Sequence, residues 1–208
     1  MNQEQKQLLD ILDHAWGTIG PKSLEAGKAL ASYCGVQYGL TLFSATAAFE
    51  ASLRGQNIGY GDQVIVAAYG DPIESMAVAL VGATPVFADI DAETLTVTAE
   101  TAAAKISVHT RAIIMGLHAG NTAHVKAVAE LCREKGLLFI LNLSDAFGAE
   151  VEGEPAAKFA DLGEAAAYAG NNGKSVITLI SSGEISGDYT IPEGVTLLIP
   201  FDEANTLY

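Results

Sequence analysis

The chain has 208 residues, half of them hydrophobic, and its formal net charge at pH 7 is −14. This length and composition are typical of one globular domain, or of one domain with a smaller appendage. The negative charge disfavours unaided nucleic-acid binding and docking on anionic membranes, because both need a basic surface. A role in solubility explains the acidity most simply.

The N-terminus and the cysteines indicate a cytoplasmic protein. The opening segment, MNQEQKQLLDILDHAW, is polar and acidic, unlike a signal peptide. We find no apolar run that is long enough to span a bilayer. Cys34 and Cys132 lie far apart and lack the spacing of a metal site, so we expect two reduced core residues and no bound metal.

Short apolar runs alternate with helical patterns along most of the chain. The runs are rich in Val, Ile, Leu and Phe, and they cover Tyr38–Phe43, Gln63–Tyr69, Thr84–Ile90, Arg111–Leu117 and Leu137–Leu143. Nearly continuous apolar runs are typical of strands that are buried on both faces. The alternation therefore predicts an α/β fold, with a mostly parallel sheet and helices on both sides of it.

Two of the helical patterns carry start and stop signals. In DPIESMAVALVG, we expect Asp71 as the N-cap, Pro72 as the first helical residue, Glu74 as the second half of a capping box, and Gly82 as the stop. TAHVKAVAELCREKG predicts a second helix that ends before Gly136, with a buried face formed by Val125, Val128, Ala129 and Cys132.

The last part of the sequence has a different character. After Gly153 the alternation weakens, and the chain becomes rich in Gly, Asn, Ser and Thr. KSVITLI and VTLLIPF predict two strands, whereas GNNG and PEG predict turns. We therefore expect a main domain over residues 1–163 and a divergent, β-rich tail over residues 164–208.

Polar residues at the ends of the predicted strands are the candidate ligand contacts. Asn142 ends a buried run in LLFILNLSDAFGAEVEG, and Asp145 follows three residues later. FSATAAFEASL places small hydroxyl residues between a strand and a helix, where backbone N–H groups either hold a phosphate or are simply capped. His118 follows another strand, and we favour an ordinary loop histidine over a functional one.

Taken together, the segments resemble the DegT/StrS-type sugar aminotransferases, which are pyridoxal-phosphate enzymes of the aspartate-aminotransferase fold (fold type I). The resemblance covers residues 13–161, and its most specific blocks are GYGDQVIV and VGATPVFADID. It implies a three-layer α/β/α large domain with a mixed, mainly parallel sheet. It also implies a homodimer, a nucleotide-sugar substrate and a chain truncated before the family's small C-terminal domain.

The resemblance assigns the cofactor contacts by position. The loop that holds the phosphate of pyridoxal phosphate corresponds to Ser44, Ala45 and Thr46. The aromatic residue that stacks on the cofactor ring corresponds to Asp71, which helix capping explains better. The hydroxyl groups of the phosphate loop are therefore kept, whereas the stacking ring is lost.

The remaining roles fall on residues that depart from the family pattern. The aspartate that pairs with the pyridinium nitrogen corresponds to Asn142, while Asp145 falls near the ring hydroxyl. The Schiff-base lysine corresponds without gaps to Asn171, and a small insertion brings Lys174 into its place. A neutral asparagine lacks the charge that stabilises a protonated ring nitrogen.

Two hypotheses follow from these departures. In the first, the chain is an aminotransferase that uses Lys174, with Asp145 compensating for Asn142. In the second, it is a non-catalytic homologue that has lost pyridoxal phosphate and keeps the fold, and a dimer surface, as a binding module or remnant. The substitutions favour a protein of aminotransferase ancestry whose activity is absent or much reduced.

Overall fold

The computed structural model describes residues 20–33 and 39–159, together with residues 2, 5, 6 and 9 near the N-terminus and two strands at 176–178 and 196–200. Cys34, Asn171 and Lys174 lie outside the described residues, as does most of the predicted tail.

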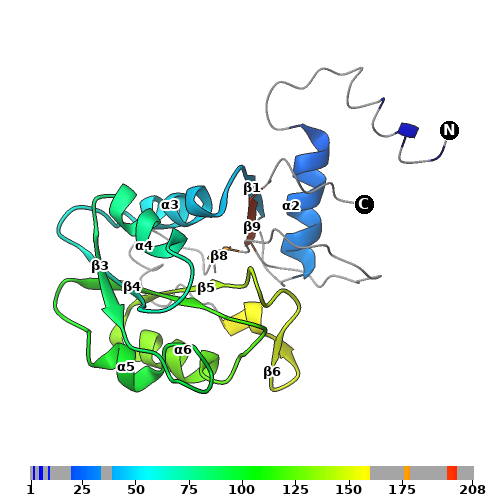
Figure 1. The fold of residues 1–208 in the computed structure, drawn as a ribbon. Coiled ribbons are helices and arrows are strands. Elements are labelled where there is room, and N and C mark those ends of the chain that lie inside the picture. The colour runs from blue at the N-terminus through cyan, green and yellow to red at the C-terminus, as the bar shows by residue number, and fades with distance from the viewer. Residues whose placement is uncertain are drawn as a thin grey trace.

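The centre of the fold is a four-stranded parallel sheet (Figure 1). Its strand order is β3–β2–β4–β5, with the bounds β2 Gln63–Ala67, β3 Thr84–Ala88, β4 Thr110–Gly116 and β5 Leu138–Asn142. Each strand occupies one of the apolar runs, shifted by no more than a few residues at its ends. The sequence analysis is confirmed for these four strands.

Helices cover both faces of this sheet. Figure 1 shows α3 (Ala45–Gly55) and α4 (Ile73–Leu80) on one side, and α5 (Ala99–Ala103) and α6 (Val125–Lys135) on the other. The α/β class and its three layers are therefore confirmed for the described residues. An additional helix, α2 (Pro21–Tyr33), packs its Leu30 and Ala31 into the core on the α6 side.

In β2, β4 and β5, alternate residues point into two separate cores. The core beneath α3 and α4 receives Val64, Val66, Ala112, Ile114, Leu138 and Ile140. The core above α6 receives Ile65, Ile113, Met115, Phe139 and Leu141. Burial on both faces explains why the runs are apolar at consecutive positions, rather than at every second one.

The helix α6 forms as the sequence predicts. Its residues Val125, Val128, Ala129 and Cys132 are buried, and Gly136 ends it in the left-handed region at a φ of 65°. Cys132 is a free thiol, and burial raises its pKa to about 12. Among the described residues, we find no helix of the length and apolarity needed to cross a bilayer, and no group of His, Cys, Asp and Glu suited to a metal ion.

Smaller elements lie around the central sheet. β1 (Leu40–Leu42) pairs in parallel with β9 (Thr196–Pro200), which pairs in turn with β8 (Val176–Thr178). The two tail strands thus fall within KSVITLI and VTLLIPF, as predicted. β6 (Glu150–Val151) and β7 (Glu154–Pro155) form a short antiparallel hairpin, which a 3₁₀ turn at Ala156–Phe159 follows.

Candidate functional site

The connections of the sheet diverge at its carboxyl edge. After β2 the chain passes into α4 on one face, whereas after the neighbouring β4 it passes into α6 on the other. Connections that diverge from adjacent parallel strands leave a crevice outside the strand ends, which is where open α/β sheets bind ligands. The topology therefore places the candidate site between the loops that follow β2 and β4, with the end of β5 beside them.

A buried pair of polar side chains lies at this edge. Asn142, the last residue of β5, donates a hydrogen bond from its Nδ2 to Oε1 of Glu74 at 2.8 Å. Each of the two residues is only 7 % exposed. Ser144 donates both its backbone N–H and its hydroxyl to Oδ1 of Asn142. The amide of Asn142 is therefore bonded at both ends by the protein itself.

Glu74 occupies an unusual position for a carboxylic acid. Burial raises its pKa from 4.5 to about 7, against the lowering effect of the Asn142 hydrogen bond and with a further upward contribution from Asp71. Gly116, at the end of β4, provides the space, since a Cβ at this position would lie 2.8 Å from Oε1 of Glu74. The hydrogen bond joins α4 to β5, and Glu74 also packs against Gly116 at the end of β4.

The predicted role of Glu74 is therefore wrong. The sequence analysis placed it in a capping box, but its carboxylate bonds Asn142 instead of the start of its own helix. A sequence signal for this role did exist: Glu74 lies on the same helix face as the buried Ala77 and Val78, at the spacing i, i+3, i+4. A lone acid on an apolar helix face needs a buried partner.

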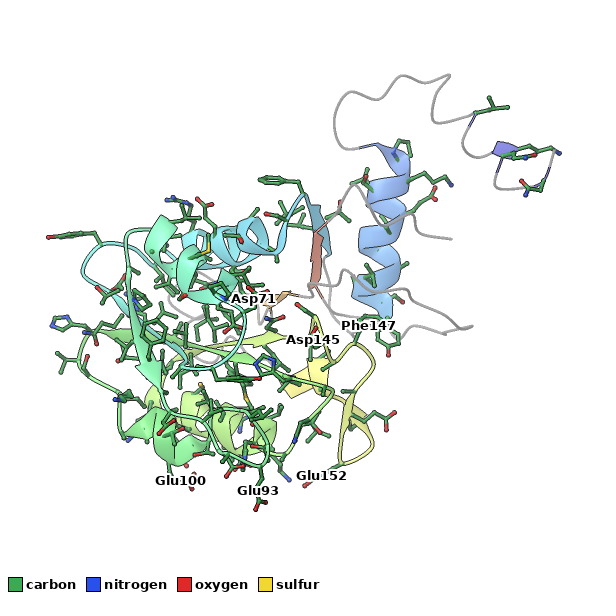
Figure 2. The ribbon with its side chains drawn as sticks, viewed as in Figure 1. Asp71, Glu93, Glu100, Asp145, Phe147 and Glu152 are labelled. Atoms are coloured by element: carbon green, nitrogen blue, oxygen red, sulfur yellow. The ribbon has the colours of Figure 1, made fainter. Side chains whose placement is uncertain are left out.

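A second polar group lies beside this pair. His118, two residues beyond the end of β4, has its Nδ1 3.8 Å from a carboxylate oxygen of Asp145, and its ring meets Tyr69 edge-on at a centroid distance of 5.5 Å. Gly70, at a φ of 130°, fits against this ring, because a Cβ there would lie 2.7 Å from Nε2 of His118. The loops after β2 and β4 therefore touch at the carboxyl edge of the sheet. Figure 2 shows Asp71 and Asp145 at this edge of the sheet.

The structure assigns local hydrogen bonds to two of the other predicted contacts. The carboxylate of Asp71 is exposed and accepts the N–H of Ile73 at 3.1 Å, so it does bond the start of α4, but the N-cap residue is Pro72 rather than the predicted Asp71. Ser44 is the N-cap of α3, where its hydroxyl oxygen accepts the N–H of Ala47 at 3.1 Å. Ala45 and Thr46 are the first two residues of that helix.

The predicted contacts thus form two groups. Asp71, Asn142 and Asp145 belong to the carboxyl edge of the central sheet. Ser44, Ala45 and Thr46 lie at the start of α3, and within the described part of the chain no hydrogen bond or ion pair joins them to the first group. Asn171 and Lys174 are not among the described residues, so the lysine position stays a prediction.

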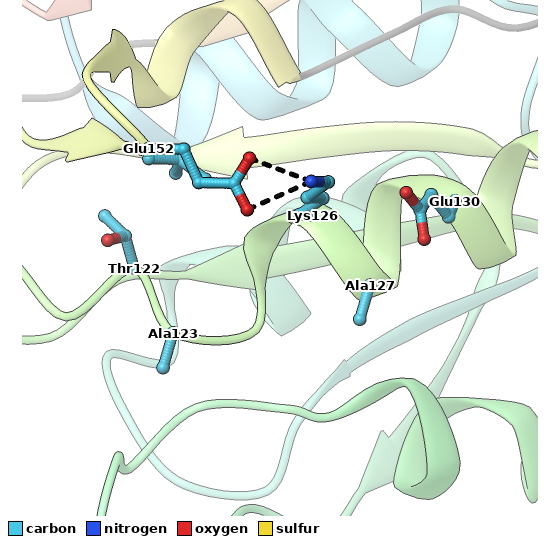
Figure 3. A pocket seen from close by; sticks show the side chains of 7 residues that line it. Thr122, Ala123, Lys126, Ala127, Glu130 and Glu152 are labelled. Carbon is cyan, nitrogen blue, oxygen red and sulfur yellow. Dashed lines mark hydrogen bonds and ion pairs between the residues drawn. The ribbon is translucent and has the colours of Figure 1, made fainter.

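An open hollow of about 390 Å³ lies elsewhere, between α6 and the β6–β7 hairpin. Figure 3 shows that the amine of Lys126 is bound by both carboxylate oxygens of Glu152, at 3.0 Å and 2.8 Å. This ion pair raises the pKa of Lys126. The lysine is therefore a fully charged surface residue with a carboxylate partner, and the hollow lacks the features of an active site.

Comparisons with known proteins agree with this architecture. The model of the DegT/DnrJ/EryC1/StrS aminotransferase family matches residues 1–185. The uncharacterized protein MJ1066 of Methanocaldococcus jannaschii is 31 % identical over 170 residues, which are 82 % of this chain and 44 % of that protein.

Solved structures with the same fold are aminotransferases. The putative sugar aminotransferase Spr1654 from Streptococcus pneumoniae, solved in apo, PLP and PMP forms, is 29 % identical with a TM-score of 0.70 over 76 % of this chain and 44 % of its own. PseC of Helicobacter pylori, an aminotransferase involved in the biosynthesis of pseudoaminic acid, is 25 % identical with a TM-score of 0.66 over 74 % of this chain and 42 % of its own. The chain spans less than half the length of each of these relatives. On sequence and on fold, it belongs to the DegT/DnrJ/EryC1/StrS aminotransferase family.

Proposed function

We propose that this chain is a sugar-aminotransferase homologue whose transaminase activity is absent or much reduced. The observation that carries the proposal is the state of Asn142, a neutral amide whose two polar ends are already bonded to Glu74 and Ser144. By resemblance, this strand end is where the family places the carboxylate that faces the ring nitrogen of pyridoxal phosphate. An amide at that position holds no charge with which to keep the ring protonated.

The size of the expected loss follows from electrostatics. Two unit charges 4 Å apart attract by about 4 kcal/mol at an effective dielectric constant of about 20. Loss of that attraction from a transition state corresponds to a rate about a thousandfold lower. Pyridoxal phosphate, when bound, supplies an electron sink, and a protonated ring is the stronger one.

The described residues nevertheless fit much of the cofactor. The N–H of Ala47 is taken by Ser44, but the first turn of α3 also holds the backbone N–H groups of Ala45 and Thr46 and the hydroxyls of Ser44 and Thr46, with no acidic side chain in that turn to repel a phosphate. At the strand end, the N–H of Asn142 that no described residue accepts fits an uncharged ring nitrogen. The site chemistry is thus compatible with binding the cofactor, and poorly suited to activating it.

Asp145 does not replace the missing charge in this proposal. Its side chain is 67 % exposed, and its nearest described ionisable partner is His118. The charge of an exposed carboxylate is screened by solvent, so it contributes little to the stability of a protonated ring nitrogen. The rival hypothesis is an active aminotransferase that uses Lys174, with Asp145 compensating for Asn142. It therefore depends on a carboxylate that lies beside His118.

The family resemblance also implies two partners, a nucleotide-sugar substrate and a second copy of the chain, and the proposal includes both. Any residual reaction would act on a nucleotide sugar, and the chain would associate with a second copy of itself. Light scattering on the purified chain tests the second statement, since a mass of one chain at all concentrations would contradict it.

The activity is tested by the conversion of bound pyridoxal phosphate to its amine form by L-glutamate, followed by absorbance, with Spr1654 as the positive control. We expect a rate at least about a hundredfold below that of the control. In parallel, borohydride reduction and peptide mapping would show whether a lysine is labelled. Turnover near the control rate, with stoichiometric labelling of Lys174, would contradict the proposal.

A further inference from the structure

The hydrogen bonds around Asn142 fix which way its amide points. An amide oxygen and nitrogen are hard to tell apart by shape alone, so a partner of known character is needed to assign them. The backbone N–H of Ser144, 3.0 Å from Oδ1, supplies that partner, because it can only donate. The oxygen of Asn142 therefore faces Ser144, and its nitrogen faces Glu74.

These bonds also determine what Asn142 has left to offer a ligand. Its oxygen accepts two hydrogen bonds, from the backbone and the hydroxyl of Ser144, which uses its two lone pairs. Its nitrogen carries two hydrogens, one of which is donated to Glu74 at 2.8 Å. Among the described residues no group accepts its other hydrogen, so that within this part of the chain a single N–H donor remains, and no acceptor.

We infer that Asn142, held by Ser144 and Glu74, is a donor-only contact that selects an uncharged, hydrogen-bond-accepting group, so that pyridoxal phosphate binds here with its ring nitrogen unprotonated. The inference rests on the proposed function, which brings the cofactor to this strand end. A protonated ring nitrogen is itself a donor, and it would meet the N–H of Asn142 head-on. Leaving that pair unmatched in a buried site is unfavourable.

Glu74 acts through Asn142 as a positioning residue. The space beside Gly116 lets its carboxylate reach the amide nitrogen from behind the strand end. With one amide hydrogen taken by Glu74 and the oxygen taken by Ser144, rotation of the Asn142 side chain would break three hydrogen bonds at once. The donor is therefore held in place before any ligand arrives.

The test is the protonation state of the ring nitrogen in the bound cofactor. Pyridoxal phosphate isotopically labelled at this nitrogen is added to the full chain, and its nitrogen NMR shift is followed between pH 6 and 8. We expect the shift of an unprotonated ring. In the Asp145→Asn control the shift should stay the same, because that carboxylate is 67 % exposed, lies 3.8 Å from His118 and is screened by solvent. A protonated ring in the unaltered chain would overturn the inference.

A double substitution reverses the contact without changing the net charge. In Glu74→Gln/Asn142→Asp, the amide and the carboxylate exchange places. The carboxylate introduced at position 142 can accept from Ser144 and from the amide introduced at position 74, and it presents an acceptor to the ligand. The bound ring should become protonated. The exchange avoids the two facing carboxylates that the single change Asn142→Asp would create, and circular dichroism checks that the variant folds. A folded double variant with an unprotonated ring would contradict the inference.

Affinity gives a second measurement. The N-methylated analogue of pyridoxal phosphate carries a permanent positive charge and accepts no hydrogen bond at the ring nitrogen. We expect it to bind the unaltered chain about tenfold more weakly than pyridoxal phosphate. Equal affinities, or no saturable binding of pyridoxal phosphate at millimolar concentration, would overturn the inference. Equal affinities of the two compounds, or the absence of saturable binding, would leave the proposed loss of activity unaffected. Turnover by a chain whose bound ring is unprotonated would contradict the proposed function and agree with this inference.

Discussion

The helices α3 and α4 begin in similar ways and use their first polar side chains differently. The helix α3 follows β1, and α4 follows β2. Each has a polar side chain at its start, Ser44 in α3 and Glu74 in α4. Ser44 bonds the N–H of Ala47 within the first turn of α3. Glu74, in the first turn of α4, bonds Asn142, which lies 68 residues further along the chain. One side chain serves its own helix, while the other joins distant strands.

The two hydrogen bonds differ in burial, and burial decides how much stability is lost when one of them is removed. The cap bond of Ser44 is only partly buried, so its loss leaves one N–H that water can reach. The Glu74–Asn142 bond is buried, so loss of either partner leaves the other polar group without water. Perturbations at α4 should therefore cost more than perturbations at α3, and they should depend on pH.

The largest expected effect is the pH dependence that Glu74 gives to stability. Its pKa is raised from 4.5 in the unfolded chain to about 7 in the folded one, so the folded state holds the proton more tightly. The resulting stability is fully present below pH 4.5 and is lost as the pH rises through 7. We expect this contribution to reach about 3 kcal/mol.

Urea unfolding at several pH values measures this contribution. Other carboxylates also titrate, so the informative quantity is the difference between the unaltered chain and Glu74→Gln, which keeps the shape and cannot ionise. The unfolding free energy of the variant should lack the decline between pH 4.5 and 7. Parallel curves for the two proteins would show that Glu74 has an ordinary pKa.

A smaller effect is expected at the glycine that makes room for Glu74. In Gly116→Ala, the new Cβ would lie 2.8 Å from Oε1 of Glu74, and the carboxylate would have to move away from Asn142. We expect a destabilisation of about 1–2 kcal/mol in thermal or urea unfolding. The matched control is Gly55→Ala at the end of α3, where a Cβ meets nothing within 4 Å. Equal effects at the two glycines would contradict the close contact.

The smallest effect is expected at the start of α3. Ser44→Ala removes the cap of Ala47 and should cost about 1 kcal/mol at every pH. Ser44→Asp, which keeps an acceptor at the same place, should restore most of the lost stability. If the loss of unfolding free energy in Ser44→Ala changes between pH 4.5 and 7, the start of α3 is energetically coupled to Glu74. That result would contradict the independence of the α3 cap from the Glu74–Asn142 pair.

The sequence predicts the local features of the fold well. The central strands, the buried face of α6 and the left-handed turn at Gly136 all follow from patterns within about fifteen residues, and each is confirmed. The hydrogen bond from the N–H of Ile73 to Asp71 is also local, although the N-cap of α4 lies one residue later than predicted, at Pro72. These features depend on residues that are close in sequence, so one segment contains all the information needed.

The candidate site was predicted less completely, for a physical reason. Asn142 and Asp145 were located because they follow a buried strand, and strand ends meet at one edge of the sheet. Glu74 was misassigned, since its partner is distant in sequence and the room for its side chain comes from a third segment, at Gly116. By its spacing in the sequence, Glu74 fits a capping box as well as it fits a buried acid. Only the packing of α4 against the sheet, which brings Glu74 to Asn142, distinguishes the two roles.

The most direct test of this account is a double-mutant cycle between positions 74 and 142. The unfolding free energies of Glu74→Leu, Asn142→Leu and the double variant are measured at pH 8, where Glu74 is mostly ionised. We predict that the double variant is more stable than the sum of the single losses implies, by about 2 kcal/mol, because each single change strands a buried polar partner. Losses that add within about 0.5 kcal/mol would contradict the coupling of Glu74 to Asn142 on which the account depends.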